Sequence, residues 1–188
     1  HITEDRPIRV AVPVNLRPYF DSITTKNFFV MVSAEFAPQK NEYTFAEILT
    51  ITKDSLRAQI NKEHLEKIFS YNVSNELMVV ARAVPLFLKN LAMRLVYTQS
   101  ALANTTTVTN IGNIKVEKVY EPYIQTVHSF LSFSKGQSLK ATITSYQDTL
   151  VYTYTSAWQD TAIQRRVFRQ IAQDGIDVKI ETNGVYYE

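Results

Sequence analysis

Three histidines are the residues of this sequence best suited to proton transfer, because histidine alone has an unperturbed pKa near neutrality. His1 is the first residue, and His64 lies in a charged run typical of a solvated helix face. His128 lies in an alternating segment, where a structural histidine is more common than a catalytic one. No catalytic triad or zinc site can be assembled from the spacing. We therefore expect no catalytic residue and no metal ligand set in this chain.

The composition excludes several other classes of protein. The 188 residues include no cysteine, which excludes disulfides and a cysteine nucleophile and fits a reducing, cytoplasmic compartment. The four glycines form no phosphate-binding loop. The net charge of +2 is spread along the chain, which argues against a nucleic-acid partner. Because no apolar stretch approaches the roughly 20 residues that span a bilayer, we also expect no membrane span.

Two stretches stand out by residue type and position. The first is VPVNLRP at residues 12–18, which is followed ten residues after Arg17 by NFF at residues 27–29. The second is TNIG at residues 109–112, at the end of an expected strand. An Asn-x-Gly sequence in that position is, taken alone, a turn signal.

The order of these stretches carries more information than either one. Together with the strand pair at 138–156 and a last helix ending at Gly175, they resemble the carboxy-terminal half of the alcohol-acetyltransferase-like branch of the chloramphenicol-acetyltransferase and condensation-domain superfamily. The similarity covers residues 8–175, and Thr109 stands where the family's SNxG motif has serine.

The resemblance implies a division of the chain and a reaction. Residues 8–181 form the carboxy-terminal lobe, 1–7 an added or crossover segment, and 182–188 a tail. The implied reaction is acyl transfer from acetyl-CoA or another acyl thioester to a small-molecule alcohol or amine. The implied general base is the histidine of an HxxxD motif in the preceding lobe, roughly 150 to 250 residues before Val12 if that lobe has ordinary domain size.

The chain itself is expected to lack that motif and to be inactive alone. The fourth residue after His64 is Ile68, and the fourth after His128 is Ser132. The amino-terminal lobe of the same polypeptide, carrying HxxxD, is therefore the expected partner.

The resemblance also implies candidate residues for the cleft between the two lobes. Candidates for tunnel-facing groups or oxyanion donors are Thr109 and Asn110, beside Gly112, whose lack of a side chain lets another segment approach. Candidates for structural or phosphate-pairing roles are Asn15, Arg17 and Asn27, with the structural role favoured for Arg17.

A second interpretation stays open, in which the same fold is a non-catalytic protein-interaction module. The 11 tyrosines and 10 phenylalanines are compatible with an apolar face that waits for a partner. Because a lobe taken from a two-lobed enzyme exposes the surface that the other lobe covers, we expect a homodimer or crystal contact through the exposed lobe interface around residues 15–17 and 109–112.

Periodicity predicts the elements that position these residues. The expected strands are 8–16, an edge or terminating strand because of Pro13, and then 27–36, 105–110, 124–133, 139–146, 150–156 and a short one at 177–181. The expected helices are 44–59 with a Thr44–Glu47 capping box, 62–71, 85–98 buried on nearly every face, and 161–174 capped by Asp160 and ended by Gly175.

This order predicts an α+β fold, a two-layer sandwich with a mostly antiparallel sheet and helices on one face, like a CoA-dependent acyltransferase lobe. The late strands should form an antiparallel meander under the helices at 44–59 and 84–98.

Overall fold

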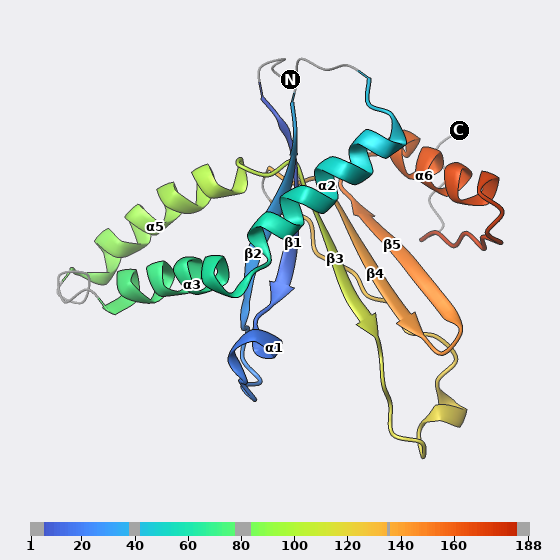
Figure 1. Ribbon diagram of the computed structural model, residues 1–188, viewed down its shortest axis with the longest axis horizontal. Helices are drawn as coiled ribbons and strands as arrows, with labels where there is room; N and C mark the ends of the chain where they lie inside the picture. The colour runs from blue at the N-terminus through green and yellow to red at the C-terminus, as the bar shows by residue number, and fades with distance from the viewer. Residues whose placement is uncertain (1–5, 38–41, 78–83, 135, 184–188) are drawn as a thin grey trace.

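A computed structural model describes residues 6–37, 42–77, 84–134 and 136–183 (Figure 1). The strands are β1 (Ile8–Asn15), β2 (Phe29–Phe36), β3 (Thr106–Asn113), β4 (Leu139–Tyr146) and β5 (Thr149–Ser156). The helices are α1 (Arg17–Phe20), α2 (Phe45–Gln59), α3 (Lys62–Leu77), α5 (Leu86–Ala101) and α6 (Ala162–Gln173), with a 3₁₀ turn η1 at Glu121–Tyr123. The α+β class is confirmed.

The sheet is mixed, so the expectation of a mostly antiparallel sheet is wrong. Its order is β2-β1-β3-β4-β5, and only the two outer pairs, β1–β2 and β4–β5, are antiparallel. The inner pairs β1–β3 and β3–β4 are parallel. The chain therefore returns to the end of the sheet at which β1 begins before it enters β3, and again before it enters β4. In a meander of hairpins, consecutive strands begin at opposite ends instead. Only the β4–β5 hairpin of the expected meander exists.

The segment 124–133 is extended but is not a strand, which explains that error. Its backbone joins no ladder. It lies over β5 instead, where the Thr153 hydroxyl donates to the Ser129 carbonyl and the Thr155 hydroxyl donates to the Leu131 carbonyl. An alternating pattern indicates extended backbone, and here side chains of the sheet hold that backbone. The expected strand at 177–181 is also absent; Lys179 there forms an ion pair with Glu181.

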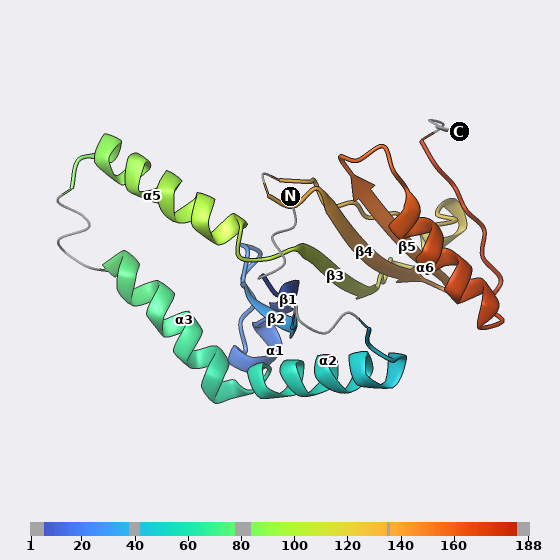
Figure 2. The same cartoon turned by 90° about the horizontal axis from the view of Figure 1, so that it is seen from above.

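Helices cover one face of the sheet, as expected for a two-layer fold. Cross-strand partners place one alternating set of side chains on this helix-covered face. The set includes Val10, Val12, Val32, Ala34, Thr106, Val108, Ala141, Ile143, Tyr152 and Tyr154. Helix α2 crosses β1 and β2, and α6 lies against β5 (Figures 1 and 2). Phe168 of α6 contacts the rings of Tyr152 and Tyr154 edge-on, at centroid distances of 6.0 and 5.9 Å.

The best-packed part of the described core lies where β1, β2 and α3 meet. Leu16, Val30 and Leu65 are buried together there. A cluster of aromatic rings surrounds them and consists of Phe20, Phe28 and Phe69, with centroids 5.4 to 6.2 Å apart. Offset and edge-on pairs of this kind contribute roughly 0.5–1.5 kcal/mol each beyond the area they bury.

Local signals predicted the start of α2 and the end of α6 correctly. The Thr44 hydroxyl accepts from the Glu47 amide, and the Glu47 carboxylate accepts from the Thr44 amide, which is the expected capping box. At α6, the N-cap residue is Thr161, one position after the expected Asp160, and its side chain forms no cap. The Asp160 carboxylate still accepts from the Ala162 amide at 2.8 Å. Gly175 follows the helix with φ of 87°. Its left-handed backbone is the reason that glycine ends this helix.

Helix α5 contradicts the expectation that it is buried and packs over the sheet. Its large apolar side chains are exposed, among them Leu91 at 58% and Leu95 at 63%. Figures 1 and 2 show α5 projecting away from the sheet. The apolar residues on nearly every face predicted a buried helix, and the described chain supplies nothing that covers them. No helix in the described ranges is long and apolar enough to cross a membrane.

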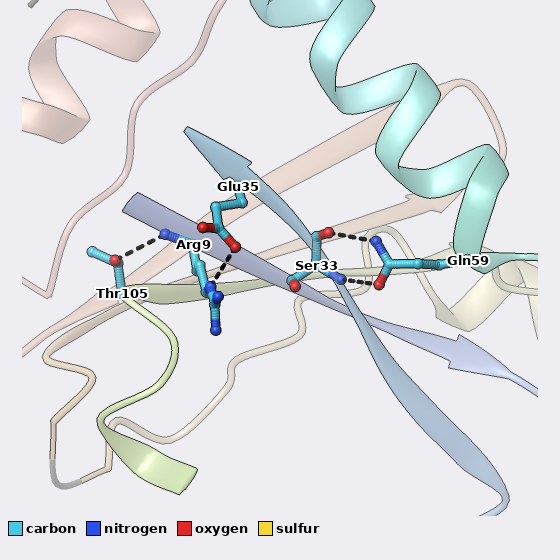
Figure 3. A network of polar contacts seen from close by, with 5 residues as sticks. All are labelled: Arg9, Ser33, Glu35, Gln59 and Thr105. Atoms are coloured by element: carbon cyan, nitrogen blue, oxygen red, sulfur yellow. Dashed lines mark hydrogen bonds and ion pairs between the residues drawn. The ribbon is translucent and has the colours of Figure 1, made fainter. Parts of the chain in front are cut away.

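Strand β1 is the second strand of the sheet, so its expected edge position is wrong. Strand β2 forms the edge, and Gln59 at the end of α2 occupies part of it (Figure 3). The Gln59 amide accepts from the Ser33 N–H at 3.1 Å and donates to the Ser33 carbonyl at 2.7 Å. A side-chain amide thus satisfies two edge groups that would otherwise invite another strand.

Pro13 is tolerated inside the sheet for a related reason. The Arg9 N–H and carbonyl both bond to Thr105, on the β3 side of β1. Strand alternation turns the Pro13 nitrogen toward the same side. Pairing between β1 and β3 stops at Ala11, so no ladder bond is lost there.

Candidate functional site

The parallel strands β1 and β3 diverge toward their carboxyl ends. They pair only at Val10–Thr106 and Ala11–Thr107, whereas β1 continues to Asn15 and β3 to Asn113 (Figure 1). We call the diverging segments, residues 12–15 and 108–113, the β1–β3 split. Residues 12–15 of the first motif and residues 109–112 of the second lie in this split, so the structure places both motifs at the carboxyl ends of two neighbouring parallel strands. The crevice beyond the carboxyl ends of parallel strands is a common ligand site.

On the β1 side, Arg17 and Asn15 hold the local chain together. The Arg17 guanidinium donates through Nε to the Thr24 carbonyl at 2.8 Å and through Nη2 to the Lys26 carbonyl at 2.7 Å. The Asn15 Oδ1 atom accepts from both the Arg17 amide and Nη1. These contacts tie the loop before β2 to the end of β1. Asn27 is exposed in that loop. A phosphate-pairing role for these residues stays a prediction.

On the β3 side, Thr109 lies on the opposite face of the sheet from the helices. Cross-strand partners align it with Thr142 and Thr153. Thr109 is half-buried, and no described residue gives its hydroxyl a hydrogen-bond partner. The neighbouring hydroxyls of Thr142 and Thr144 also have no partner in the described protein, and these residues are only 2% and 1% exposed. A row of unpaired hydroxyls therefore begins at the split.

The sequence Asn110-Ile111-Gly112 forms a β-bulge rather than a turn. The register of β3 against β4 shifts between Asn110 and Gly112, and the strand continues to Asn113. The Asn110 side chain accepts from the Gly112 amide at 2.9 Å, and Gly112 has φ of 82°. A Cβ at Gly112 would meet no atom within 4 Å. Backbone conformation, and not the expected close approach of another segment, is what requires glycine in the described chain.

A tyrosine pair on β5 was not predicted from the sequence. The hydroxyls of Tyr152 and Tyr154 are 2.9 Å apart, and Phe168 covers both rings. Burial, and then the hydrogen bond from Tyr152, raise the pKa of Tyr154 well above its usual value. The alternation of two tyrosines on one strand could have indicated a shared face. Tyr154 therefore stays protonated at neutral pH, so its hydroxyl can hydrogen-bond but cannot act as a base.

The two histidines that the structure describes, His64 and His128, lie away from the split. His64 is exposed on α3, where its backbone amide is capped by Asn61. His128 is exposed, with its ring stacked on Phe130 at 6.4 Å. One sequence expectation needs correction: His1 and Asp5 do have the HxxxD spacing. Both residues lie outside the described residues. Asp5 is only seven positions before Val12, whereas the resemblance implies a separation of about one domain length.

The chemistry available at the split follows from these residues. Its described side chains are neutral hydroxyl, amide and apolar groups, so they can donate hydrogen bonds to an anionic oxygen but cannot remove a proton. No group of three or more potential metal ligands occurs among the described residues. No protein-family model, curated protein or solved structure matches the chain. Any functional assignment therefore depends on the residues and geometry given above.

Proposed function

We propose that this chain is the carboxy-terminal lobe of an acyl-CoA-dependent acyltransferase of the chloramphenicol-acetyltransferase and condensation-domain type. One observation supports this function best. The two motifs of the resemblance, at 12–18 and 109–112, are nearly 100 residues apart in the sequence, yet residues of both lie in the same split. A site shared by both motifs is what a common function requires. The proposed setting is the cytoplasm.

In the proposed reaction, an acceptor alcohol or amine attacks the carbonyl carbon of an acyl thioester. A histidine of the preceding lobe takes the acceptor's proton, and the carbonyl oxygen becomes an oxyanion. Thr109 is the proposed donor to that oxyanion, because its hydroxyl has no described partner to compete for its proton. When the intermediate collapses, the C–S bond breaks and the thiol leaves with the proton. One such donor contributes about 3–4 kcal/mol in other acyl-transfer enzymes.

The second candidate function is the non-catalytic interaction module, and the exposure of α5 favours it specifically. An apolar helix that its own chain leaves uncovered is what a docking module would present. The two candidates differ in one respect that can be measured. An interaction module binds its partner without turning over a thioester.

The test begins with the reading frame that encodes this chain. The acyltransferase proposal requires an HxxxD motif about one domain upstream of Val12. The whole polypeptide is then assayed for thiol release from acetyl-CoA and other acyl thioesters with a panel of alcohols and amines. Because this chain contains no cysteine, it adds no thiol background to the assay. An upstream frame without the motif, or a motif-bearing polypeptide without turnover on any donor, would overturn the proposal.

The role of Thr109 is tested with matched variants of the whole polypeptide. We expect Thr109→Val to lower kcat about 100-fold to 1,000-fold, and Thr109→Ser to retain most activity because it keeps the hydroxyl. Thr155→Val is the control, since that hydroxyl lies on the same sheet face but donates to a backbone carbonyl. Equal activity of Thr109→Val and the control would remove Thr109 from the mechanism.

The 188-residue chain alone should release no thiol above the rate without protein. If it does, the triple variant His1→Ala, His64→Ala and His128→Ala decides whether a histidine of this chain is responsible. Activity lost in the triple variant would place the base in this chain and contradict its assignment to the preceding lobe.

A further inference from the structure

Helix α5 carries exposed apolar side chains that the described chain does not cover. They are half of the residues of this sixteen-residue helix: Leu86, Phe87, Leu88, Leu91, Met93, Leu95, Val96 and Tyr97. A sixteen-residue helix gains little from its own backbone in water, because most helical stability in proteins comes from tertiary packing. Something outside the described contacts must therefore pack against it.

The distribution of apolar side chains identifies the kind of surface that fits. At about 100° per residue, Leu88, Leu91 and Leu95 share one side of the helix. Leu86, Met93 and Tyr97 share the opposite side. A helix at a membrane surface has one apolar and one polar side, whereas a helix that is apolar all round is buried in protein. The expected occupant is thus a protein groove that encloses α5.

The charges on α5 add a second requirement. Lys89 and Arg94 are the only charged residues from 84 to 101, and both are cations. Burial of an unpaired cation is costly, so the groove must offer carboxylates or solvent at these two positions. A basic or wholly apolar groove would not satisfy them.

Connectivity indicates which protein supplies the groove. Helix α5 ends at Ala101, four residues before Thr105. The Thr105 amide donates to the Arg9 carbonyl at 2.9 Å, and the Thr105 hydroxyl accepts from the Arg9 amide at 3.1 Å (Figure 3). Arg9 is the second residue of β1. A polypeptide segment that leads from a preceding lobe into β1 therefore arrives beside the carboxyl end of α5.

We infer that α5 is the helix on which the preceding lobe docks, with an apolar groove around the helix and carboxylates facing Lys89 and Arg94. The inference rests on the proposed function, which supplies that lobe. It moves the principal lobe contact from the expected interface at 15–17 and 109–112 to the projecting helix. The split is then free to serve the reaction.

The test compares hydrogen exchange of α5 amides in the whole polypeptide and in the 188-residue chain. We expect exchange to be at least roughly tenfold slower in the whole polypeptide, the effect of burying one leucine. Leu91→Glu should abolish the difference. Leu49→Glu on α2 is the matched control, because Leu49 is 55% exposed and Leu91 is 58% exposed. The double variant Lys89→Glu and Arg94→Glu should weaken the protection as well. Circular dichroism of each variant checks that the sheet and helices remain.

Three results would overturn the inference. The first is equal exchange of α5 in both polypeptides. The second is concentration-dependent protection in the 188-residue chain that Leu91→Glu removes, which would assign α5 to a second copy. The third is protection that appears only with anionic vesicles, which would assign it to a lipid surface. Acyl transfer is measured on the same samples. Turnover without protection of α5 would support the proposed reaction and contradict the docking. Protection of α5 without turnover would support the docking and contradict the proposed reaction.

Discussion

Two helices of this protein have the same length and opposite surroundings. Leu65 of α3 is fully buried against β1 and β2, whereas Leu91 of α5 is 58% exposed. Both leucines lie in sixteen-residue helices. The comparison shows that an apolar pattern predicts a helix that needs a partner, but not where the partner is. Leu65 of α3 packs against the sheet, whereas the described chain leaves Leu91 of α5 mostly exposed.

Truncation of the two leucines should give the largest difference. We expect Leu65→Ala to lower the free energy of unfolding by about 2–5 kcal/mol, because it removes buried methyl groups and leaves a cavity. Leu91→Ala should change it by less than about 0.5 kcal/mol in the 188-residue chain. Denaturant unfolding of both variants at equal protein concentration measures the two values.

A large cost for Leu91→Ala would break the comparison, since it would mean that α5 is already packed in this chain. Repeating the measurement at a tenfold higher protein concentration separates the sources of such packing. A cost that grows with concentration points to a second copy, and a constant cost to the chain's own surface.

Local features of the fold could be predicted from the sequence because neighbouring residues determine them. The capping box at Thr44 and the glycine after α6 depend on interactions within a few residues, and the strands at 8–15, 139–146 and 149–156 carry a recognisable local residue pattern. The direction of pairing does not. Parallel pairing of β3 with β4 depends on how residues 114–138 cross the sheet, and the alternation at 124–133 is the same for a strand and for an extended cover.

The candidate site was predicted in its residues but not in its geometry. The motifs at the ends of β1 and β3 were both singled out, yet their meeting at one split depends on where the ladder between the strands ends. The unpaired hydroxyls of Thr142 and Thr144 gave no signal, because threonine is also an ordinary strand residue. An Asn-x-Gly sequence favours a left-handed backbone at glycine both in a turn and in a β-bulge, so the sequence alone could not distinguish the two.

The edge of β2 gives a second, smaller contrast with α5, because here the chain does supply its own cover. We expect Gln59→Ala to lower the free energy of unfolding by about 1–3 kcal/mol, since two hydrogen bonds to Ser33 are lost. Gln170→Ala, which removes an exposed hydrogen bond to Asp174, should change it by less than about 0.5 kcal/mol. Hydrogen exchange at the Ser33 amide should accelerate only in the Gln59 variant.

For both glutamine variants, thermal unfolding measures stability and sedimentation measures association. Association of Gln59→Ala that the parent chain does not show would mean that the amide also keeps the edge from pairing with another chain. Unchanged stability and unchanged Ser33 exchange would instead mean that water replaces the side chain at no cost.

The smallest effect concerns two glycines that share a conformation but not a location. Gly112 at the split has φ of 82°, Gly175 after α6 has φ of 87°, and neither has an atom within 4 Å of a Cβ. Because only the backbone conformation opposes a side chain, Gly112→Ala and Gly175→Ala should each cost about 1–2 kcal/mol in the 188-residue chain, measured by denaturant unfolding. A markedly larger cost at Gly112 would show that this chain already packs against the split. The same pair in the whole polypeptide sharpens the comparison: if a second lobe approaches the split closely, Gly112→Ala becomes the costlier substitution there and lowers acyl transfer, while Gly175→Ala keeps its value.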